Sequence, residues 1–509
     1  MNKTHAPERP ASDGRPVTLR RVTADDADCL FRWRSDERIY RFFRTPTTPA
    51  WDEHVDWLRA RLADPGCFLF VIEHDGRPAG HIRIERRYGS TYEVSIYVDP
   101  DFHRCGIGGA ALRLVRDRAP FATLSATVLP GNDASRRLFD AAGYVPEGGH
   151  MVNRPQRRGP TVAICPDGGP DVGLGHLTRC AGLAKEIAAR GVPVALLVPA
   201  DPIVQAMTPP AAEIVTLPEG ADAADLHLLT AGAGALVVDH YRLDLAALAA
   251  RIGADAPILH FDDHDRPVPG IAISVNGSPA AAGGDGPGAS GPPHRLYGPR
   301  YQILRDDVRP RGSRRAERPE RLLVTYGGAD PLEMRPVLQR LVTDVVARRW
   351  PDLHVDFVVG RLAVPPAGPW PENATVHHGP DNMPELMAAC DVAVTAGGQT
   401  MFELARCGAP MVVMILGEDQ RPNVEAMERN GCILNAGWAA GPRWVDAVSD
   451  MLDTLLSEDS SRERLHRAAR KLFDGNGAKR IADAILRAMD GRPPDACRAT
   501  GFQTERNAC

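Results

Sequence analysis

Histidine, aspartate and tyrosine residues follow apolar runs in the middle of the chain. His176 stands in the stretch DVGLGHLTRC, Asp239 and Tyr241 end the run ALVVDHY, and Asp263 follows the run PILHF. An imidazole can take up a proton as a general base, and residues at strand ends of α/β sheets commonly face a ligand cleft. These residue types predict a catalytic cleft, provided that the fold brings the segments together.

The glycine turn before His176 matches neither standard phosphate loop. A dinucleotide fingerprint needs a third glycine where this chain has Thr178, and a P-loop ends in Gly-Lys-Ser/Thr, which is absent here. Gly173 and Gly175 instead predict a tight turn that presents His176 at a helix N-terminus. The positive helix end favours a neutral imidazole, which suits a general base. A histidine that only caps the helix is the alternative.

The run HFDDHD (260–265) consists largely of residue types that ligate metals. Alternation along a strand places neighbouring side chains on opposite faces, and no second cluster supplies further ligands. We therefore expect no metal in this cleft.

Two domains with parallel sheets must position these residues. TVAICP opens one and RLLVTYGG (321–328) opens the other, and each strand leads through a Gly-rich turn into a helix. Continuous apolar strands between helices are typical of a parallel sheet buried on both faces. Two such domains in tandem predict a cleft between them, with ligands at the carboxyl ends of the strands.

Paired glycines end two strands of the last domain, in LLVTYGGAD and VAVTAGGQTMFE. Such turns suit backbone contacts with a diphosphate. Glu403, in the first turn of the next helix, can accept both hydroxyl groups of a ribose.

The clearest pattern in the first domain is TYEVSIYVDPDFHRCGIGGAALRLVRDR (91–118), a strand, a glycine loop and a helix. Backbone N–H groups of such a loop bind a pyrophosphate at the helix N-terminus. ATVLPGNDASRRLFDAAGYV (126–145) adds a strand and a helix that begins at an asparagine. This order resembles the GNAT acetyltransferase superfamily over 16–148, and FRWRSDERIYRFF (31–43) resembles its amino-sugar and ribosomal branch.

The GNAT resemblance implies acetyl-CoA as co-substrate. The residues implied to bind it are Val98, His103, Arg104, Cys105, Gly106, Ile107, Gly108, Gly109, Asn132 and Ser135. Glu93 is a candidate general base acting through water, with a structural carboxylate as the alternative. Phe139 replaces the tyrosine that usually protonates the leaving thiolate, so another group or water must supply that proton.

The motifs GLGHLTR, VVDHY, FDD, GPRYQILR, YGGAD, AGGQTMFE and EDQ…N occur in this order over 161–440. As a set they resemble the UDP-2,4-diacetamido-2,4,6-trideoxy-β-L-altropyranose hydrolases of pseudaminic-acid biosynthesis. That family has a GT-B fold related to MurG-type glycosyltransferases and needs no metal. The chain is therefore expected to be α/β, with an N-terminal GNAT domain followed by a GT-B pair of Rossmann-like domains.

The hydrolase resemblance carries site residues with it. The implied catalytic residues are His176, Asp239 and Tyr241, and the implied sugar-binding residues are Gly175, Arg179, His240, Asp263 and Asn276. The implied UDP-binding residues are Gly327, Gly328, Asp330, Met383, Gly397, Gly398, Gln399, Glu403 and Gln420.

Length and composition limit the number of domains, the classes of partner and the cellular compartment. The 509 residues predict two to four domains, and the net charge of −5 gives no basic footprint for nucleic acid. The sequence has no apolar run long enough for a membrane span and no signal-peptide pattern. The 10 cysteines form no C-x-x-C pair, as expected for a protein of the reducing cytoplasm. The oligomeric state stays open.

Domain boundaries follow from composition. The stretch around 149–160 is rich in Gly, Pro and Arg, and GSPAAAGGDGPGASGPP (277–293) predicts a flexible surface loop. The predicted boundaries are a disordered 1–15, a GNAT domain at 16–148, a linker at 149–160, a first GT-B domain at 161–308, a second at 321–489 and a disordered tail at 490–509.

Three functions remain open from sequence alone. The first is a bifunctional enzyme that acetylates a UDP-4-amino sugar and then releases UDP by hydrolysis. The second is a GT-B glycosyltransferase that passes the sugar to an acceptor, and the third is a sugar-nucleotide sensor without turnover. A protein N-terminus is the alternative substrate for the first domain.

Overall fold

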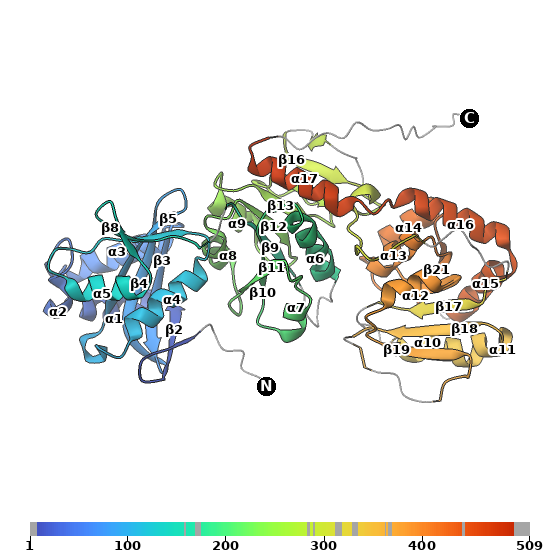
Figure 1. Ribbon diagram of the computed structural model, residues 1–509, viewed down its shortest axis with the longest axis horizontal. Helices are drawn as coiled ribbons and strands as arrows, with labels where there is room; N and C mark the ends of the chain where they lie inside the picture. The colour runs from blue at the N-terminus through green and yellow to red at the C-terminus, as the bar shows by residue number, and fades with distance from the viewer. Residues whose placement is uncertain are drawn as a thin grey trace.

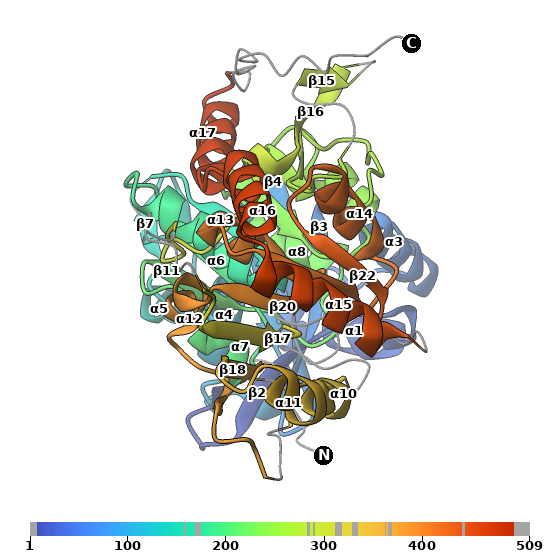
Figure 2. The same cartoon turned by 90° about the vertical axis from the view of Figure 1, so that its right-hand side faces the viewer.

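Three α/β units, each built on its own sheet, follow one another in a row along the chain (Figure 1). The computed structural model describes residues 8–156, 159–167, 175–281, 286–288, 291–310, 318–327, 334–361, 363–364, 369–439 and 443–492. The view in Figure 2 places the third unit in front of the other two. The prediction of one mixed α/β domain followed by two parallel-sheet domains is confirmed.

The first unit has eight strands in the order β1-β2-β3-β4-β5-β6-β8-β7, and only β5 and β6 run parallel. The strands are β1 (Arg9–Pro10), β2 (Pro16–Arg21), β3 (Cys67–His74), β4 (Arg77–Tyr88), β5 (Thr91–Val98), β6 (Thr123–Ala126), β7 (Val145–Glu147) and β8 (His150–Asn153). The helices are α1 (Ala27–Arg34), α2 (Glu37–Tyr40), α3 (Trp51–Ala63), α4 (Ile107–Arg118) and α5 (Asp133–Ala141).

Two predicted boundaries of this unit are wrong. Residues 8–15 are ordered rather than disordered, because β1 pairs with β2 and Arg9 forms an ion pair of 2.8 Å with Asp117 on α4. The linker expected at 149–160 begins later, because β8 pairs with β6 and belongs to the first sheet.

The second unit has the strand order β11-β10-β9-β12-β13-β14-β16-β15, and all pairs except β15–β16 are parallel. The strands are β9 (Val162–Pro166), β10 (Val194–Val198), β11 (Ala212–Thr216), β12 (Ala235–Asp239), β13 (Ile258–Phe261), β14 (Ile273–Asn276), β15 (Gly286–Gly288) and β16 (Gly291–Tyr297). The helices are α6 (Gly175–Ala188), α7 (Pro202–Ala206), α8 (Ala223–Thr230) and α9 (Leu245–Ile252).

The predicted surface loop 277–293 contains regular structure. Strands β15 and β16 pair in antiparallel fashion at the edge of the second sheet, and β16 also pairs with β14. The sheet edge supplies backbone partners that the Gly- and Pro-rich composition did not reveal.

The third unit is a parallel sheet in the order β19-β18-β17-β20-β21-β22. The strands are β17 (Arg321–Thr325), β18 (His354–Val359), β19 (Ala374–His378), β20 (Val392–Ala396), β21 (Met411–Ile415) and β22 (Leu434–Trp438). The helices are α10 (Arg335–Arg340), α11 (Ala347–Arg349), α12 (Met383–Ala389), α13 (Gln399–Cys407), α14 (Arg421–Arg429), α15 (Trp444–Ser457) and α16 (Asp459–Leu472).

The last described helix, α17 (Gly477–Met489), leaves the third unit and packs on the second (Figure 1). Ile481 and Ile485 lie in the same buried cluster as Leu177 of α6, and Arg190 binds Asp483 at 2.9 Å. The predicted third domain, 321–489, thus includes a helix that packs on the second unit. The chain crosses twice between the two parallel-sheet units.

Helix α8 joins the first unit to the second. Leu226 and Leu229 pack into the core of the second unit, whereas Leu228 packs into the core of the first. A Cβ on the nearby Gly232 would lie 2.4 Å from the carbonyl oxygen of Phe121, so the backbones touch here. A helix that is apolar on all sides is buried on all sides, and α8 fits that rule.

Among the described residues, no helix combines the length and apolar character that crossing a membrane would need.

Candidate functional site

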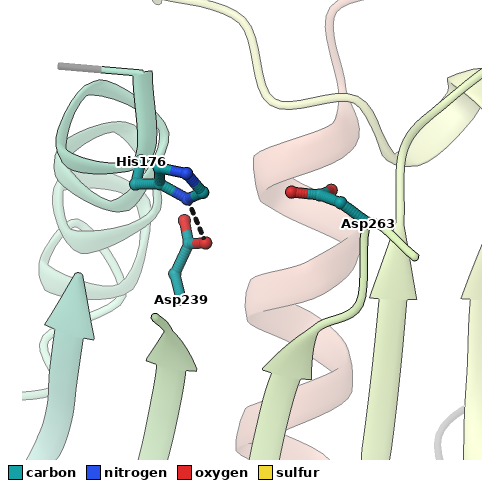
Figure 3. Close-up of side chains that lie close together, drawn as sticks. All are labelled: His176, Asp239 and Asp263. Atoms are coloured by element: carbon teal, nitrogen blue, oxygen red, sulfur yellow. Dashed lines mark hydrogen bonds and ion pairs between the residues drawn. The ribbon is translucent and has the colours of Figure 1, made fainter. Parts of the chain in front are cut away.

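His176 and Asp239 form a hydrogen-bonded pair at the carboxyl edge of the second sheet (Figure 3). Nδ1 of His176 lies 2.6 Å from Oδ1 of Asp239, whose side chain has no exposed surface. The Arg179 Nη2 lies 3.1 Å from the same nitrogen, but the closer contact is to the carboxylate oxygen, which can only accept, and this favours the tautomer with the proton on Nδ1. In a neutral ring that tautomer leaves the lone pair on Nε2, which is the arrangement of a general base with an orienting carboxylate.

The parallel topology explains why these residues meet. Strands β9, β12 and β13 are neighbours in the sheet, and their carboxyl ends lie at one edge. Asp239 is the last residue of β12, Asp263 follows β13, and His176 is the second residue of α6. His176, Asp239 and Asp263 therefore converge, as the strand-end motifs predict.

Arg179 lies between the two carboxylates, one helical turn after His176. Its Nε donates to Asp239 Oδ2 at 2.5 Å, and its Nη2 donates to Asp263 Oδ2 at 2.6 Å. The guanidinium also stacks over the Phe261 ring, 4.7 Å from its centroid. The resemblance implied a sugar contact for Arg179, and the structure shows that its charge first neutralises this buried pair.

The positive charge of Arg179 and the negative charges of Asp239 and Asp263 stabilise one another. Burial raises the pKa of Asp239, but Arg179 and His176 outweigh burial, so its pKa lies well below the usual range. Burial lowers the pKa of Arg179, whereas Asp239 and Asp263 raise it, and its pKa ends well above the usual value. Asp239 is therefore a carboxylate at neutral pH.

Tyr241 lies on the solvent side of His176 and contacts both His176 and Asp263. Its hydroxyl donates to Asp263 Oδ2 at 2.7 Å, and its ring meets the His176 ring edge-on with centroids 4.5 Å apart. Burial and Asp263 raise the pKa of Tyr241, so the phenol keeps its proton. About half of Tyr241 is exposed, which leaves it in reach of a ligand.

The cluster has the residue types of a metal site but not its charge balance. Donor atoms of His176, Asp239 and Asp263 lie within 4.8 Å of one another. Arg179 already occupies the space between the carboxylates and supplies the positive charge. A divalent cation does not fit while the guanidinium holds this place.

Two of the other residues that the resemblance assigns to the sugar, Asn276 and His240, form hydrogen bonds with the protein backbone. Asn276 donates to the carbonyl oxygen of Asp262 at 2.8 Å and accepts from the Ser278 backbone at 3.0 Å. His240 accepts from the backbone N–H of Arg242 at 3.2 Å. Gly175 is the first residue of α6 and lies exposed beside the pair.

Asp167 is a site residue that the sequence motifs did not single out. It is buried after β9, and its backbone N–H donates to the Asp239 carbonyl at 2.6 Å. Its carboxylate accepts from Arg242 at 2.7 Å. The signal was present, because Asp167 is a carboxylate at the end of the strand next to β12.

Asp262 and Asp263 point to opposite sides, as strand alternation predicts. Asp262 is buried and accepts from the Tyr297 hydroxyl at 3.1 Å, on the side away from His176. Only Asp263 reaches the cluster.

In the third unit, Gly397 and Gly398 form the turn before α13, and Gln420, the residue before α14, contacts this turn. Oε1 of Gln420 accepts from the backbone N–H groups of Gly397 at 3.2 Å and Leu416 at 3.1 Å, which ties two strand ends together. A Cβ on Gly397 would lie 2.4 Å from Val424, whereas one on Gly398 would meet nothing within 4 Å. Gly398 therefore opens the helix N-terminus, and Gln420 positions the turn.

Glu403 and Gln399 contact the segment that crosses between the two parallel-sheet units. Arg305 donates to both oxygens of Glu403 at 2.9 Å, and Gln399 donates to the Ile303 carbonyl at 2.7 Å. Burial raises the pKa of Glu403, and Arg305 opposes the rise. The predicted ribose acceptor is thus already paired with an arginine that the sequence reading did not assign to the site.

The structure also describes Met383 and Gly327, which the resemblance assigns to UDP. Met383 begins α12 and packs against the core, and Gly327 follows β17 with a φ of +106°. Gly328 and Asp330, like Gly173 of the opening motif, lie outside the described residues.

A cavity of about 1120 Å³ lies in the first unit. Strands β5 and β6 pair only at Thr91–Glu93, and from Val94 onward β5 has no partner on that side among the described strands. The parting strands expose backbone groups to which an extended ligand can bind. Every residue that the GNAT resemblance assigns to acetyl-CoA lines this cavity except Cys105.

The glycine loop before α4 is fixed by the N-terminal segment. The Ser12 backbone donates to the Cys105 carbonyl at 2.8 Å, and a Cβ on Gly106 would lie 2.9 Å from the Ser12 nitrogen. Arg104 and Gly106 both have positive φ, at 68° and 75°. His103 places Nε2 3.1 Å from the Val98 carbonyl. The loop therefore has a defined shape that presents the N-terminus of α4.

Asn132 and Ser135 shape the start of α5, where the Asn132 side chain accepts from the Ser135 backbone at 3.1 Å. Phe139 is buried against Tyr144, with ring centroids 4.9 Å apart. The position that carries tyrosine in the related family is therefore an apolar wall here.

Glu93 lies in the cavity but is held by cations. Arg44 donates to its carboxylate at 2.8 Å, Thr127 donates at 2.9 Å, and Arg87 forms a further close ion pair. These contacts match a structural carboxylate at least as well as a free general base.

Two family models match the chain. The acetyltransferase (GNAT) domain matches residues 17–145, and the glycosyltransferase family 28 C-terminal domain matches residues 372–485.

Two curated relatives match parts of the chain. One is the spore coat polysaccharide biosynthesis protein SpsG of Bacillus subtilis, 24% identical over 39% of this chain and 58% of that protein. The other is the uncharacterized protein MJ1062 of Methanocaldococcus jannaschii, 26% identical over 25% of this chain and 28% of that protein. The chain thus spans less than two thirds of the length of either relative.

Solved structures resemble separate parts of the chain. The glycotransferase of kitacinnamycin is 19% identical, covers 65% of this chain and 99% of its own, and has a TM-score of 0.46. AAC(6')-Ib in complex with paromomycin and acetyl-CoA is 18% identical, covers 28% of this chain and 94% of its own, and has a TM-score of 0.26. From its sheets and its family matches, the chain joins a GNAT acetyltransferase domain to a GT-B pair with a family 28 glycosyltransferase-like C-terminal domain.

Proposed function

We propose that the chain is a bifunctional nucleotide-sugar enzyme. The first domain transfers an acetyl group from acetyl-CoA to the amine of a UDP-4-amino-4,6-dideoxy sugar, and the GT-B pair releases UDP from the diacetamido product by hydrolysis. The observation that carries the hydrolytic half is the 2.6 Å contact between His176 and Asp239. This assignment places the chain in the biosynthesis of pseudaminic acid or a related nonulosonic acid.

In the hydrolytic step, Nε2 of His176 takes a proton from water. The water oxygen forms a bond to the anomeric carbon, the bond from that carbon to the diphosphate oxygen breaks, and UDP leaves with the bonding electrons. Asp239 acts as a positioning residue, because it fixes the tautomer and stabilises the imidazolium that forms. Arg179 and Tyr241 hold the pair and the neighbouring Asp263 in place.

The departing diphosphate needs positive potential that is fixed in advance. Gly398 opens the N-terminus of α13, a helix of 9 residues, and free N–H groups there favour an anion. Gln420 sets the shape of this turn through the Gly397 backbone. Such fixed dipoles can stabilise a leaving diphosphate without a metal.

In the acetyl-transfer step, acetyl-CoA would lie along the open edge of β5, with its pyrophosphate at the N-terminus of α4. The sugar amine attacks the thioester carbon, the carbon–sulfur bond breaks, and the amine loses a proton. Because Phe139 has no acidic proton, another group of the cavity or water must take up the proton that the amine loses and supply one to the thiolate.

Fusion of the two activities supports consecutive reactions. One domain would add an acetyl group to a nucleotide-linked amino sugar, and the other would remove the nucleotide. SpsG is a spore coat polysaccharide biosynthesis protein, which agrees with a sugar-derived substrate.

The second candidate is a glycosyltransferase, and the family 28 match over residues 372–485 favours it. The same pair would then deprotonate an acceptor hydroxyl group in place of water. The two candidates use one base and differ in what enters the cleft.

Mass spectrometry on the purified chain tests both halves. Given acetyl-CoA and a UDP-4-amino-4,6-dideoxy sugar, we expect the mass of the sugar nucleotide to rise by one acetyl group. UDP and free diacetamido sugar should then appear in equal amounts without any acceptor. If the acetylated UDP sugar accumulates and is consumed only after an acceptor is added, the hydrolase assignment fails and the glycosyltransferase stands.

A further inference from the structure

His81 and Tyr97 stand side by side in the wall of the acetyltransferase cavity. His81 on β4 pairs directly with Tyr97 on β5, and their ring centroids lie 5.2 Å apart. Both residues line the cavity, and neither is among those that the GNAT resemblance assigns to acetyl-CoA. An imidazole and a phenol therefore share one face of the sheet.

Neither polar group has a protein partner. In the part of the chain that the structure describes, the buried Nε2 of His81 makes no hydrogen bond, and no partner reaches the Tyr97 hydroxyl. His81 is only 4% exposed. Buried polar groups in proteins nearly always have a partner, so the unpaired polar groups of His81 and Tyr97, two residues in the wall of a ligand-sized cavity, are available to a ligand.

Both side chains are uncharged at neutral pH. Burial, with help from Arg83 and His54, lowers the pKa of His81 to about 3, and burial raises the pKa of Tyr97. A neutral imidazole and a phenol each offer one donor and one acceptor. They match an uncharged group that also both donates and accepts, and they offer no charge to a carboxylate or an ammonium group.

The pair is remote from the reacting centre of the proposed function. Acetyl transfer would occur where β5 and β6 part, after Glu93. Tyr97 lies four residues further along β5, which is roughly 13 Å at the usual rise of a strand. An acceptor as long as a nucleotide sugar can reach both places.

We propose that His81 and Tyr97 recognise an uncharged, two-way hydrogen-bonding group at the far end of the acetyl acceptor, such as the imide edge of a pyrimidine base. This inference rests on the proposed acetylation of a nucleotide sugar. It makes the two residues determinants of acceptor specificity and gives them no part in proton transfer.

Steady-state kinetics with two acceptors tests the proposal on the full chain. The acceptors are the UDP-4-amino-4,6-dideoxy sugar and the same amino sugar as its 1-phosphate, which lacks the base. For His81→Leu and Tyr97→Phe we expect KM for the UDP sugar to rise at least tenfold. KM for the sugar phosphate and KM for acetyl-CoA should stay within twofold of the wild type.

His227→Leu is the matched control. His227 is also a buried histidine of 3% exposure whose Nδ1 has no described partner, but it lies between the first two units and outside this cavity. It should change stability without changing either acceptor KM. His81→Gln keeps a donor and an acceptor and should restore part of the discrimination, and it replaces His81→Leu if that variant does not fold.

The outcomes distinguish failure of the proposed function from failure of the proposed recognition by His81 and Tyr97. If the wild type acetylates neither acceptor, the proposed function fails. If it acetylates the UDP sugar but the variants leave its KM unchanged, or raise KM equally for both acceptors, recognition of the far end by this pair is overturned.

Discussion

The imidazole of His176 points its Nδ1 at Asp239, 2.6 Å away, and Asp239 is at the same time held by Arg179 at 2.5 Å. The carboxylate is therefore shared between a base and a cation. Because Asp239 has no exposed surface, it cannot exchange either partner for water. The orientation of His176 is set by the fold before any substrate enters.

Replacing Asp239 by asparagine should stop UDP release. The amide can donate to Nδ1, which would leave the proton on Nε2 and remove the lone pair that the reaction needs. We expect kcat for UDP release to fall by roughly 10²–10⁴-fold, as such tautomer changes do in other dyads. A coupled assay for UDP measures this, and acetyl transfer by the same preparation should be unchanged.

Asp262→Asn is the control for that variant. Asp262 is equally buried on the neighbouring strand, but it contacts Tyr297 on the opposite side. Its folded variant should keep kcat. Equal losses in both variants would mean that burial of any carboxylate in this sheet, and not the dyad, sets the rate.

Chelation should leave UDP release intact. Arg179 supplies the charge that balances Asp239 and Asp263, so no divalent cation is needed there. The rate after exhaustive dialysis against EDTA should match that of the untreated enzyme. A rate lost with EDTA and recovered with Mg²⁺ or Mn²⁺ would contradict this view of the cluster.

Ser12→Pro should weaken acetyl-CoA binding. Proline has no N–H, so the contact with the Cys105 carbonyl is lost and the glycine loop loses its support. Loss of one hydrogen bond of about 1 kcal/mol would raise KM for acetyl-CoA roughly fivefold. Ser12→Ala keeps the backbone donor and should behave like the wild type, and an effect of equal size in both variants would argue against the loop contact.

Stability should fall as the pH is lowered from about 6.5 towards 4. Burial, with Arg251 and Arg86, lowers the pKa of His227 to about 4, below the value of about 6.5 in an unfolded chain. Between these two values the unfolded state binds more protons, so the free energy of unfolding decreases as pH decreases. Urea unfolding at pH 7, 6, 5 and 4.5 measures the slope.

His227→Leu should flatten that slope, because the proton no longer favours the unfolded chain at this position. His81, with a pKa of about 3, contributes in the same direction and should keep part of the slope. A slope unchanged in His227→Leu would place the pH sensitivity elsewhere.

The cluster of His176, Asp239 and Asp263 could be predicted from the sequence because parallel strands align their ends. Motifs that end β12 and β13 had to meet at one edge, and the turn after β9 had to deliver His176 to the same place. Residue types at strand ends were therefore enough to bring His176, Asp239 and Asp263 together.

What sequence reading missed depends on long-range packing. The bridging position of Arg179 and the pairing of Arg305 with Glu403 are set by side-chain geometry between distant segments. Helix α17 follows the third unit in sequence, but its apolar face fits α6 of the second. Residues 8–15 look polar and unstructured, and only their pairing with β2 and α4 orders them.

One signal was present in the sequence and was not used. The segment AADLHLLT (223–230) has apolar residues at 223, 224, 226, 228 and 229, which point in all directions around a helix and argue against one solvent-facing side. Such a helix must be covered twice. Here the second cover is the acetyltransferase domain.

Helix α8 packs into the cores of the first and second units. Loss of packing in one of these units therefore also lowers the stability of the other. Leu228 cannot leave the first core without disturbing Leu229 in the second. We therefore expect unfolding of the first unit to destabilise the second, and the reverse, so that the two units unfold together.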